Sequence, residues 1–572
     1  MAPITQFLTR LLSFGDASFG FRTNYQTPLD PNSAQKPTHG AIACENDICA
    51  DIGARIYRQG GNAIDATIAT TLCVGVIGSY HSGIGGGGFA LVRSRDGHYE
   101  AIDFRESAPA ASTENMYQRG DRRSVIGGLA AGVPGELRGL AYLHKNYASL
   151  PWKELVLPAA KLATNGWKAN ADLVRYMTAM GNFTSNAFLT EDPNWAMDMA
   201  PYGHLLREGE LITRKRYGKT LATIAEEGVK SFYEGDLAKS MIDAVQKKSG
   251  IMTLDDLKNY QIKLRNVSQI TYRGHKMSSP SSPSSGTVAL SVIKTLETYK
   301  DLGWPETYNV SFHRLIESIK WAYAARTRIG DPDYVEDSDF EEHQMLNMTN
   351  LEIIRSKISD NQTYPPEFYN PDYIEALRSH GTSQISASDA SGLAISLTST
   401  VNTLFGSQVL TPDTGIIMNN EMDDFSIPGQ NNTFGYKPSK ANLIRPHKRP
   451  LSSITVIIVE KPDGSVYFVT GAAGGSRIPT ATIQSILNVV DRNMTTSCSI
   501  KQPRLHTQVE PAVVALESGF DAGLEEYLKG LGHNVTVIAR APTSVHAIRS
   551  LPDGGFEAVG ETRQMDSAGR VV

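Results

Sequence analysis

Apolar residues recur at every fourth position in two neighbouring segments near the start of the chain. Isoleucine occupies positions 48, 52 and 56 of the first segment, and residues 64–72 repeat the same spacing. This spacing places the apolar side chains on one face of a helix. Gly60-Gly61 separates the two segments, so the pattern predicts two helices joined in a hairpin.

Shorter β-type patterns follow. Residues 88–104 predict two strands around Asp96-Gly97, a dipeptide typical of tight hairpin turns. Residues 150–260 are expected to be mainly helical, and the Ser/Pro-rich stretch 277–286 indicates a loop that caps a following helix. After about residue 382 the strongest patterns are short β-prone runs at 393–401, 454–460 and 465–471. We find no internal repeat, and expect helices around a β core in one interwoven unit.

Length and composition narrow the function classes. A chain of 572 residues allows roughly three to five ordinary domains, or one large fused domain. The 55 basic and 60 acidic residues give a net charge of −5, which excludes a strongly basic nucleic-acid binder and an acidic disordered tail protein. The most apolar segment, residues 66–77, is too short to cross a membrane, so no transmembrane segment is expected.

The cysteines and the sequons bear on the compartment. The four cysteines contain no short C-x-x-C pair, so no zinc site is expected. The helical hairpin would bring Cys49 and Cys73 to the same end, where they form either a disulfide, adding about 3 kcal/mol, or two ordinary buried thiols. Eight N-x-S/T sequons favour a secretory, extracellular or vacuolar glycoprotein, whereas the N-terminus lacks a clear apolar signal region. We leave the compartment open.

Two glycine clusters are candidates for ligand binding or catalysis. Residues 83–88 match the G-x-G-x-x-G spacing of dinucleotide sites, but a predicted helix precedes them and a strand follows. This order is the reverse of a nucleotide-binding turn, so we expect a turn with close backbone packing. Gly474 and Gly475 follow a predicted strand, where they form either an oxyanion hole of backbone amides or a plain turn.

The chain has no H-E-x-x-H and no G-x-S-x-G motif, which removes the usual signatures of zinc proteases and α/β-hydrolases. Thr382 follows Gly381 and precedes a β-prone segment. If the chain is cut between these two residues, the free α-amine of Thr382 can act as base for its own hydroxyl. The alternative is a Ser/Thr-rich edge strand without catalytic function.

Six motifs in order carry a resemblance that covers about residues 38–560. They are SGIGGGGF (82–89), DFRESAP (103–109), the threonine segment 382–406, NEMDDFS (420–426), RPLSS (449–453) and GAAGGSRI (471–478). With them the sequence resembles the γ-glutamyltransferase (γ-glutamyl transpeptidase) family of N-terminal-nucleophile hydrolases. The resemblance implies an α+β fold, a four-layer αββα sandwich with two stacked antiparallel sheets covered by helices. It also implies a precursor that cuts itself between Gly381 and Thr382.

Residues 1–37 are polar and turn-rich without a period, so we expect an N-terminal arm. The resemblance divides the rest of the chain into a large subunit (38–381) and a small subunit (382–572), the two subunits forming one fused domain. It implies that Thr382 is the nucleophile, that Thr400 orients it, and that Gly474 and Gly475 form the oxyanion hole. It also favours the Cys49–Cys73 disulfide. The remaining residues implied to bind substrate are Arg105, Asn402, Glu421, Asp424, Ser452 and Ser453.

These roles suit a γ-glutamyl group, which is a zwitterion at its α-carbon. A guanidinium with hydroxyl donors, Arg105 with Ser452 and Ser453, fits its carboxylate. Glu421 and Asp424, with Asn402, fit its ammonium. The structural alternatives are a surface ion pair of Arg105 with Glu106, a solvated acidic turn at 421–424, and strand-capping serines.

The implied activity is cleavage of the γ-glutamyl amide of glutathione or its conjugates through an ester on the threonine, with transfer to water, an amino acid or a peptide. No cofactor and no metal are implied. The competing hypotheses are a related side-chain amide acylase and an uncleaved, inactive homologue with a binding or scaffold role. Departures from the family pattern at Gln384, Ile454, Val456 and Gly560-Glu561 suggest a divergent, fungal-like eukaryotic member that acts on a bulky conjugate.

Overall fold

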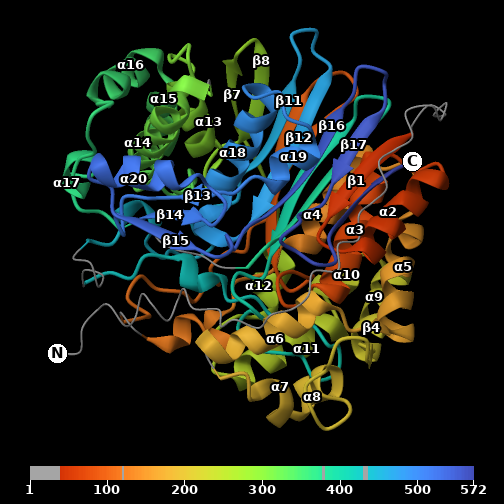
Figure 1. The fold of residues 1–572 in the computed structure, drawn as a ribbon. Coiled ribbons are helices and arrows are strands. Elements are labelled where there is room, and N and C mark those ends of the chain that lie inside the picture. Colours follow the sequence, from red (N-terminus) through yellow and green to blue (C-terminus); the bar gives the residue numbers. More distant parts are fainter. Residues whose placement is uncertain (1–38, 119–120, 184, 304, 376–380, 430–435) are drawn as a thin grey trace.

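Two antiparallel β-sheets lie face to face at the centre of the computed structural model, and helices cover both outer faces (Figure 1). The structure describes residues 39–118, 121–183, 185–303, 305–375, 381–429 and 436–572. The predicted N-terminal arm, residues 1–37, lies outside this part of the chain. The expected α+β sandwich of two antiparallel sheets between helical layers is confirmed.

The first sheet has seven strands in the order β18-β1-β9-β10-β2-β3-β6. Their bounds are β1 Gly40–Cys44, β2 Gly87–Arg93, β3 Tyr99–Asp103, β6 Lys263–Arg265, β9 Ser383–Asp389, β10 Ala394–Thr400 and β18 Ala568–Val571. The second sheet has six strands in the order β17-β16-β12-β11-β8-β7. Their bounds are β7 Val267–Tyr272, β8 His275–Pro280, β11 Val456–Glu460, β12 Val466–Ala473, β16 Ser544–Ser550 and β17 Phe556–Val559. Two smaller sheets consist of β4 Trp167–Lys168 with β5 Leu211–Ile212, and β13 Leu505–His506 with β14 Val514–Glu517 and β15 Val535–Ile538.

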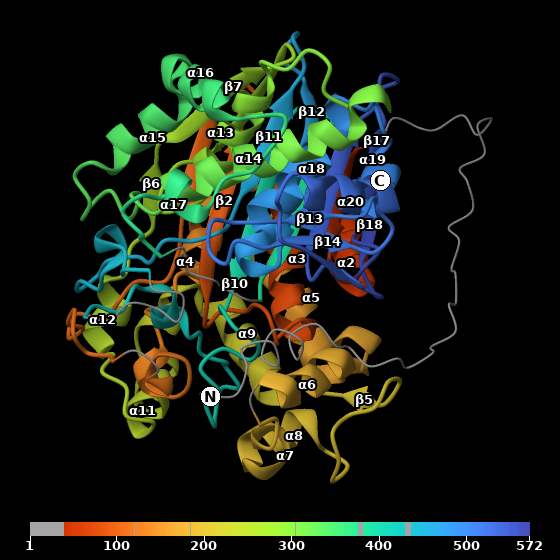
Figure 2. The ribbon, with the colours of Figure 1, turned by 60° about the vertical axis from the view of Figure 1, so that its left-hand side comes forward.

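Helices before residue 260 pack beside the first sheet or gather at one end of both sheets, where Figure 2 shows α6, α7, α8 and α11. They confirm the helical prediction for residues 150–260. Their bounds are α2 Asp47–Arg58, α3 Ala63–Ile77, α4 Glu136–Tyr147, α5 Trp152–Asn165, α6 Ala171–Phe183, α7 Phe188–Glu191, α8 Pro193–Met199, α9 Lys215–Glu227, α10 Lys230–Tyr233, α11 Asp236–Lys247 and α12 Leu254–Asn259.

The later helices form the layer over the second sheet, with α13 and α18 in direct contact with its strands. Their bounds are α13 Gly286–Leu296, α14 Tyr308–Arg326, α15 Ser338–Leu346, α16 Met348–Lys357, α17 Pro366–Tyr369, α18 Ile478–Val490, α19 Thr496–Lys501 and α20 Ala522–Gly530.

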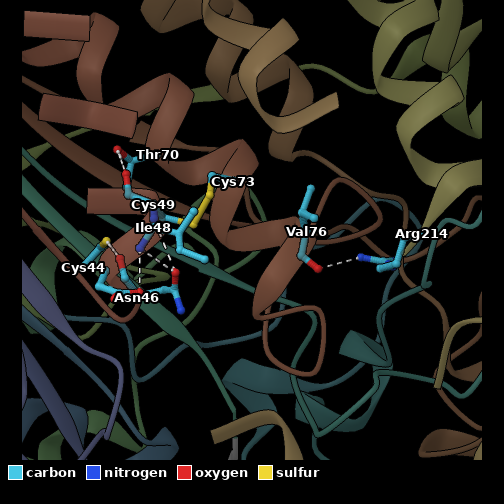
Figure 3. Close-up of a disulfide and its surroundings, with 9 residues drawn as sticks. Cys44, Asn46, Ile48, Cys49, Thr70, Cys73, Val76 and Arg214 are labelled. Carbon is cyan, nitrogen blue, oxygen red and sulfur yellow. Dashed lines mark hydrogen bonds between the residues drawn. A yellow bond between two sulfur atoms is a disulfide. The ribbon is translucent and has the colours of Figure 1, made fainter. Parts of the chain in front are cut away.

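The predicted helical hairpin is confirmed and carries a disulfide (Figure 3). The side chain of Asn46 accepts the amide of Ile48 at 3.0 Å and so caps α2. Helix α3 is buried on all sides between the sheet and α5. The Cys49–Cys73 bond, with Cα atoms 5.4 Å apart, joins the two helices, so the prediction of a disulfide is confirmed.

The glycine loop before β2 packs against backbone, as expected. A Cβ atom on Gly85 would lie 2.1 Å from the carbonyl oxygen of Ile417, and one on Gly86 would lie 2.0 Å from that of Thr400. No side chain fits at these distances. The glycines therefore allow the end of β10 and the segment around residue 417 to pack closely against the loop backbone.

The prediction of a loop at 277–286 is only partly right. Residues 277–280 are the last residues of β8, and only residues 281–285 form a loop before α13. The serines of this strand are buried and bonded: Ser279 Oγ donates to the carbonyl of Val456 at 2.7 Å. Pairing with β11 thus satisfies polar groups that in the sequence resemble a linker. No helix within the described ranges has the length and apolar character needed to cross a membrane.

Candidate active site

A small pocket with an empty volume of about 200 Å³ brings together every predicted catalytic and substrate-binding residue except Gly474 and Gly475. The register of the β9–β10 hairpin explains part of this arrangement, because Ser383 pairs with Ser399 and so Thr382 and Thr400 meet at the same end of the sheet. The pocket is lined by Arg105, Gly381, Thr382, Thr400, Asn402, Glu421, Asp424, Ser452, Ser453, Ile454 and Ile478.

At the predicted cut, two hydroxyls point at the same peptide carbonyl. Thr382 Oγ1 donates to the carbonyl oxygen of Gly381, and Thr400 Oγ1 donates to this oxygen at 2.9 Å. The amide of Asn402 donates to Thr400 Oγ1 at 2.8 Å, and Asn402 takes a left-handed backbone with φ of 73°. The Gly381 carbonyl is therefore polarised by a donor that is itself held in place.

Arg105 is a buried ion-pair centre. Its side chain is 2% exposed and contacts Glu421 through Nη1 and Asp424 through Nη2, the latter at 2.5 Å. Burial alone would lower the pKa of Arg105, but these two carboxylates raise it above its ordinary value. The alternative of a surface ion pair with Glu106 is therefore wrong, because Arg105 is buried and its ion pairs are with other carboxylates.

The acidic segment 421–424 forms a buried 3-10 turn instead of a solvated one. The amide of Glu421 donates to Asn419 Oδ1 at 2.9 Å, which fixes the start of the turn. The carbonyl of Asp424 accepts from Asn442 at 2.7 Å. Asp423, to which the sequence assigned no role, points elsewhere and accepts from Ser124 Oγ at 2.9 Å.

Ser452 and Ser453 lie in a segment without regular secondary structure before β11, which begins only at residue 456, so they do not cap that strand. The amide of Ser452 donates to the carbonyl of Pro283 at 2.8 Å. Arg326, near the pocket but absent from the sequence motifs, donates to Ser453 Oγ at 3.2 Å and to Ser285 Oγ at 3.0 Å. Sequence reasoning missed Arg326 because no motif surrounds it.

Gly474 and Gly475 follow the end of β12 with φ of 128° and 62°, values that favour glycine. They are not among the residues that line the pocket. Ile478, three residues further on, does line it. The loop is held by close packing, since a Cβ on Gly474 would lie 2.5 Å from the carbonyl oxygen of Pro542.

Gln384, one of the departures from the family pattern, is buried between the two sheets. Its amide nitrogen donates to Ser396 Oγ at 2.9 Å, and its carbonyl accepts from Thr398 Oγ1 at 2.5 Å. It faces Gly471 of β12, where a Cβ would lie 2.5 Å from the Gln384 carbonyl oxygen. Gln384 thus joins β9 to β10 without lining the pocket.

One cluster within the described ranges has the composition of a metal site. His313, Glu317 and His533 are buried together, and none of them lines the pocket. Their polar atoms are already bonded: the two histidines contact each other at 2.8 Å, and the Lys320 ammonium lies 3.1 Å from Glu317. A lysine cation at the carboxylate favours a hydrogen-bonded ion cluster over a cation site.

Comparisons with known proteins agree with this geometry. The sequence profile described as "Gamma-glutamyltranspeptidase" matches residues 49–571. The chain is 47% identical over 547 residues to "Glutathione hydrolase proenzyme" of Arthroderma benhamiae, covering 93% of each chain. It is 43% identical to "Glutathione hydrolase" of Aspergillus flavus, covering 94% of this chain and 91% of that one.

Among solved structures, cephalosporin acylase from Bacillus halodurans superposes with a TM-score of 0.80 at 25% identity, covering 95% of this chain and 99% of that one. The shared fold and the family profile across nearly the whole described chain agree with the fungal relatives. The protein therefore belongs to the γ-glutamyltranspeptidase family.

Proposed function

We propose that this protein is a self-processing enzyme that cleaves the γ-glutamyl amide bond of glutathione or its conjugates and transfers the glutamyl group to water, an amino acid or a peptide. The observation that carries the proposal is the single pocket that joins a threonine hydroxyl to one arginine and two carboxylates. The names of the fungal relatives support the same substrate.

Self-cleavage would generate the large subunit (38–381) and the small subunit (382–572). Thr382 Oγ attacks the carbonyl carbon of Gly381, its proton passes to the departing Thr382 nitrogen, and the peptide bond becomes an ester. Water then hydrolyses this ester, leaving a carboxylate on Gly381 and a free amine on Thr382. The Thr400 hydroxyl, 2.9 Å from the carbonyl oxygen, supports this step because it stabilises the negative charge that develops there.

Substrate recognition would use both charges of the γ-glutamyl head. Its carboxylate would bind Arg105 together with Ser452 and Ser453, and its ammonium would bind Glu421 and Asp424, with Asn402 beside them in a supporting role. Within the pocket Arg105 and the carboxylates neutralise one another. A zwitterion can replace these contacts with its own two charges, whereas an acyl group that carries one charge leaves a buried ion unpaired.

In the catalytic step, the α-amine of Thr382 takes the hydroxyl proton as Oγ attacks the γ-carbonyl carbon. The amine of the leaving group is released with that proton, and the glutamyl group remains as an ester on Thr382. Backbone amides of Gly474 and Gly475 are the proposed oxyanion donors. Water or an amine then attacks the ester and regenerates the hydroxyl.

A side-chain amide acylase is the second candidate, since the fold is similar to that of a cephalosporin acylase. The paired charges around Arg105 favour a γ-glutamyl substrate. The third hypothesis, an uncleaved binding protein, rests on Gln384, which lies away from the pocket and leaves Thr382 and Thr400 in place.

One preparation of purified protein tests all three functional hypotheses. The proposal predicts fragments of about 381 and 191 residues, the smaller beginning at Thr382, with release from γ-glutamyl anilide and none from the glutaryl anilide that lacks the ammonium. Thr382→Ala abolishes both cleavage and release. Faster turnover of the glutaryl compound would favour the acylase, and an intact inactive chain would favour the binding protein. Comparing glutathione with S-substituted conjugates identifies the preferred donor.

A further inference from the structure

Glu106, next to Arg105, is a buried carboxyl that the proposed mechanism does not use. It is 0% exposed, and by hydrogen-bond geometry neither of its carboxyl oxygens has a partner among the described residues. Its side chain lies beside that of Glu421. Both flank Gly132, where a Cβ would lie 3.1 Å from Glu106 Cβ and 3.4 Å from Glu421 Cβ.

Two carboxyl groups in contact and away from water cannot both be ionised. Burial raises the pKa of both groups above their ordinary values. Arg105 offsets part of this cost, but the same guanidinium also neutralises Asp424. The ionisable groups that face the pair are Arg105, Asp424, Glu136, Tyr260 and, after cleavage, the α-amine of Thr382, and Arg326 lies beyond them near Asp424.

The buried carboxyls outnumber the arginines around the pocket, so the site is neutral only if some carboxyls are protonated. Glu136 is buried and contacts Ser399 Oγ, and burial raises its pKa to about 8, so it carries its own proton near neutral pH. Of the remaining three carboxyls, Glu421 and Asp424 contact Arg105, and Asp424 also interacts with Arg326 at longer range. One further proton on the Glu106–Glu421 pair brings the unoccupied pocket to neutrality.

We propose that Glu106 and Glu421 share one proton in the unoccupied pocket, and that the ammonium of a γ-glutamyl ligand displaces this proton into the solvent. This inference rests on the proposed function. Glu106 is then a positioning residue: with Glu421 it holds the shared proton until a ligand cation arrives, and the pair loses this proton as the ligand binds. Because the proton competes with the ligand, affinity rises with pH by up to about tenfold per unit while the pair remains protonated.

The test counts protons on the mature, cleaved enzyme. Calorimetric titration in two buffers of different ionisation enthalpy gives the number of protons released when L-glutamate binds. We expect close to one proton per L-glutamate at about pH 6.5 and none for glutarate, which lacks the ammonium. In Glu106→Gln, which cannot share an acidic proton, the release and the pH dependence of affinity between about pH 6 and 8 both disappear.

Asp423→Asn is the matched control, because this neighbouring carboxyl contacts Ser124 and not the pair. It should release the same number of protons as the wild type. Binding of L-glutamate without proton release, or undiminished release in Glu106→Gln, overturns the inference and leaves the proposed function standing. Failure of the wild type to bind L-glutamate overturns both. The comparison of L-glutamate with glutarate uses only the wild type, so it tests the inference even if Glu106→Gln does not fold.

Discussion

Asp103 and Arg449 form a buried ion pair of 2.7 Å that joins two segments of the pocket far apart in the sequence. Asp103 also accepts the backbone amide of Arg105 at 2.9 Å, and Arg449 lies three residues before Ser452. The pair therefore fixes the guanidinium and the hydroxyls proposed to bind one carboxylate. Arg265 contacts the same aspartate at 2.8 Å.

Asp103→Asn should destabilise the protein, because it leaves Arg449 and Arg265 buried with less compensation. We expect the free energy of unfolding to fall by about 3–5 kcal/mol, measured by urea denaturation. Asp96→Asn, at an exposed turn, should change it by less than about 0.5 kcal/mol. An equally small effect at Asp103 would contradict this account of the pocket.

The same pair predicts a pH dependence. Burial opposes ionisation of Asp103, but Arg449 and Arg265 outweigh it and lower the pKa of this carboxyl. A lowered folded-state pKa contributes stability above the unfolded value of about 3.9, and this contribution is lost as the pH falls through the folded value. The stability difference between wild type and Asp103→Asn should be constant above about pH 5 and shrink only below about pH 4.

Thr400→Val should slow self-cleavage, since it removes the hydroxyl that donates to the Gly381 carbonyl and keeps the side-chain shape. Loss of one such donor typically costs about 10²–10³-fold in rate. Gel time courses of freshly purified precursor measure the effect. Thr400→Ser retains the hydroxyl and should cleave at a rate near that of the wild type, while equal rates for all three proteins would remove Thr400 from the reaction.

Asp424→Asn should raise KM for a γ-glutamyl anilide more than it lowers kcat, because the proposed contact is with the ammonium in both ground and transition states. Loss of a charged hydrogen bond of about 1.5–3 kcal/mol corresponds to roughly 10–100-fold. Steady-state kinetics on cleaved enzyme measure it. Asp423→Asn, adjacent in sequence but bonded to Ser124, is the control and should leave KM nearly unchanged.

Replacing Cys49 and Cys73 by serine should lower the free energy of unfolding by about 3 kcal/mol, because the disulfide closes a loop between positions 24 residues apart. Chemical denaturation with and without reductant measures this difference. Cys498→Ser changes an exposed free thiol and should have no comparable effect.

Gly471→Ala should strain the contact between the sheets, since the new Cβ would lie 2.5 Å from the Gln384 carbonyl oxygen. We expect a loss of about 1–3 kcal/mol in stability. Adding Gln384→Ala makes room for the methyl group, so the double variant should lose less than the sum of the two single variants. Additive losses would show that the two residues do not interact.

Local sequence patterns predicted the elements that near neighbours determine. The fourfold spacing at 48–56 and 64–72 gave the helical hairpin, and Asp96-Gly97 gave the turn between β2 and β3. The prediction for 277–286 was partly wrong because a Ser/Pro-rich sequence is typical of a linker. Here the serines of β8 lie in a sheet, where Ser279 is hydrogen-bonded to a neighbouring strand. Strand pairing with β11 satisfies these groups, and nothing in the local sequence records that partner.

The sequence by itself determined the family and the residue types of the pocket, and it predicted a nucleophile directly after Gly381, because these depend on short motifs and their order. Only the tertiary structure decided which charges touch. Arg105 meets Asp424 across 319 positions of sequence, Glu106 meets Glu421, and Arg326 reaches Ser453 from a helix with no motif. The physical reason is that burial removes water as a partner, so the state of each charge depends on the neighbours that folding brings to it.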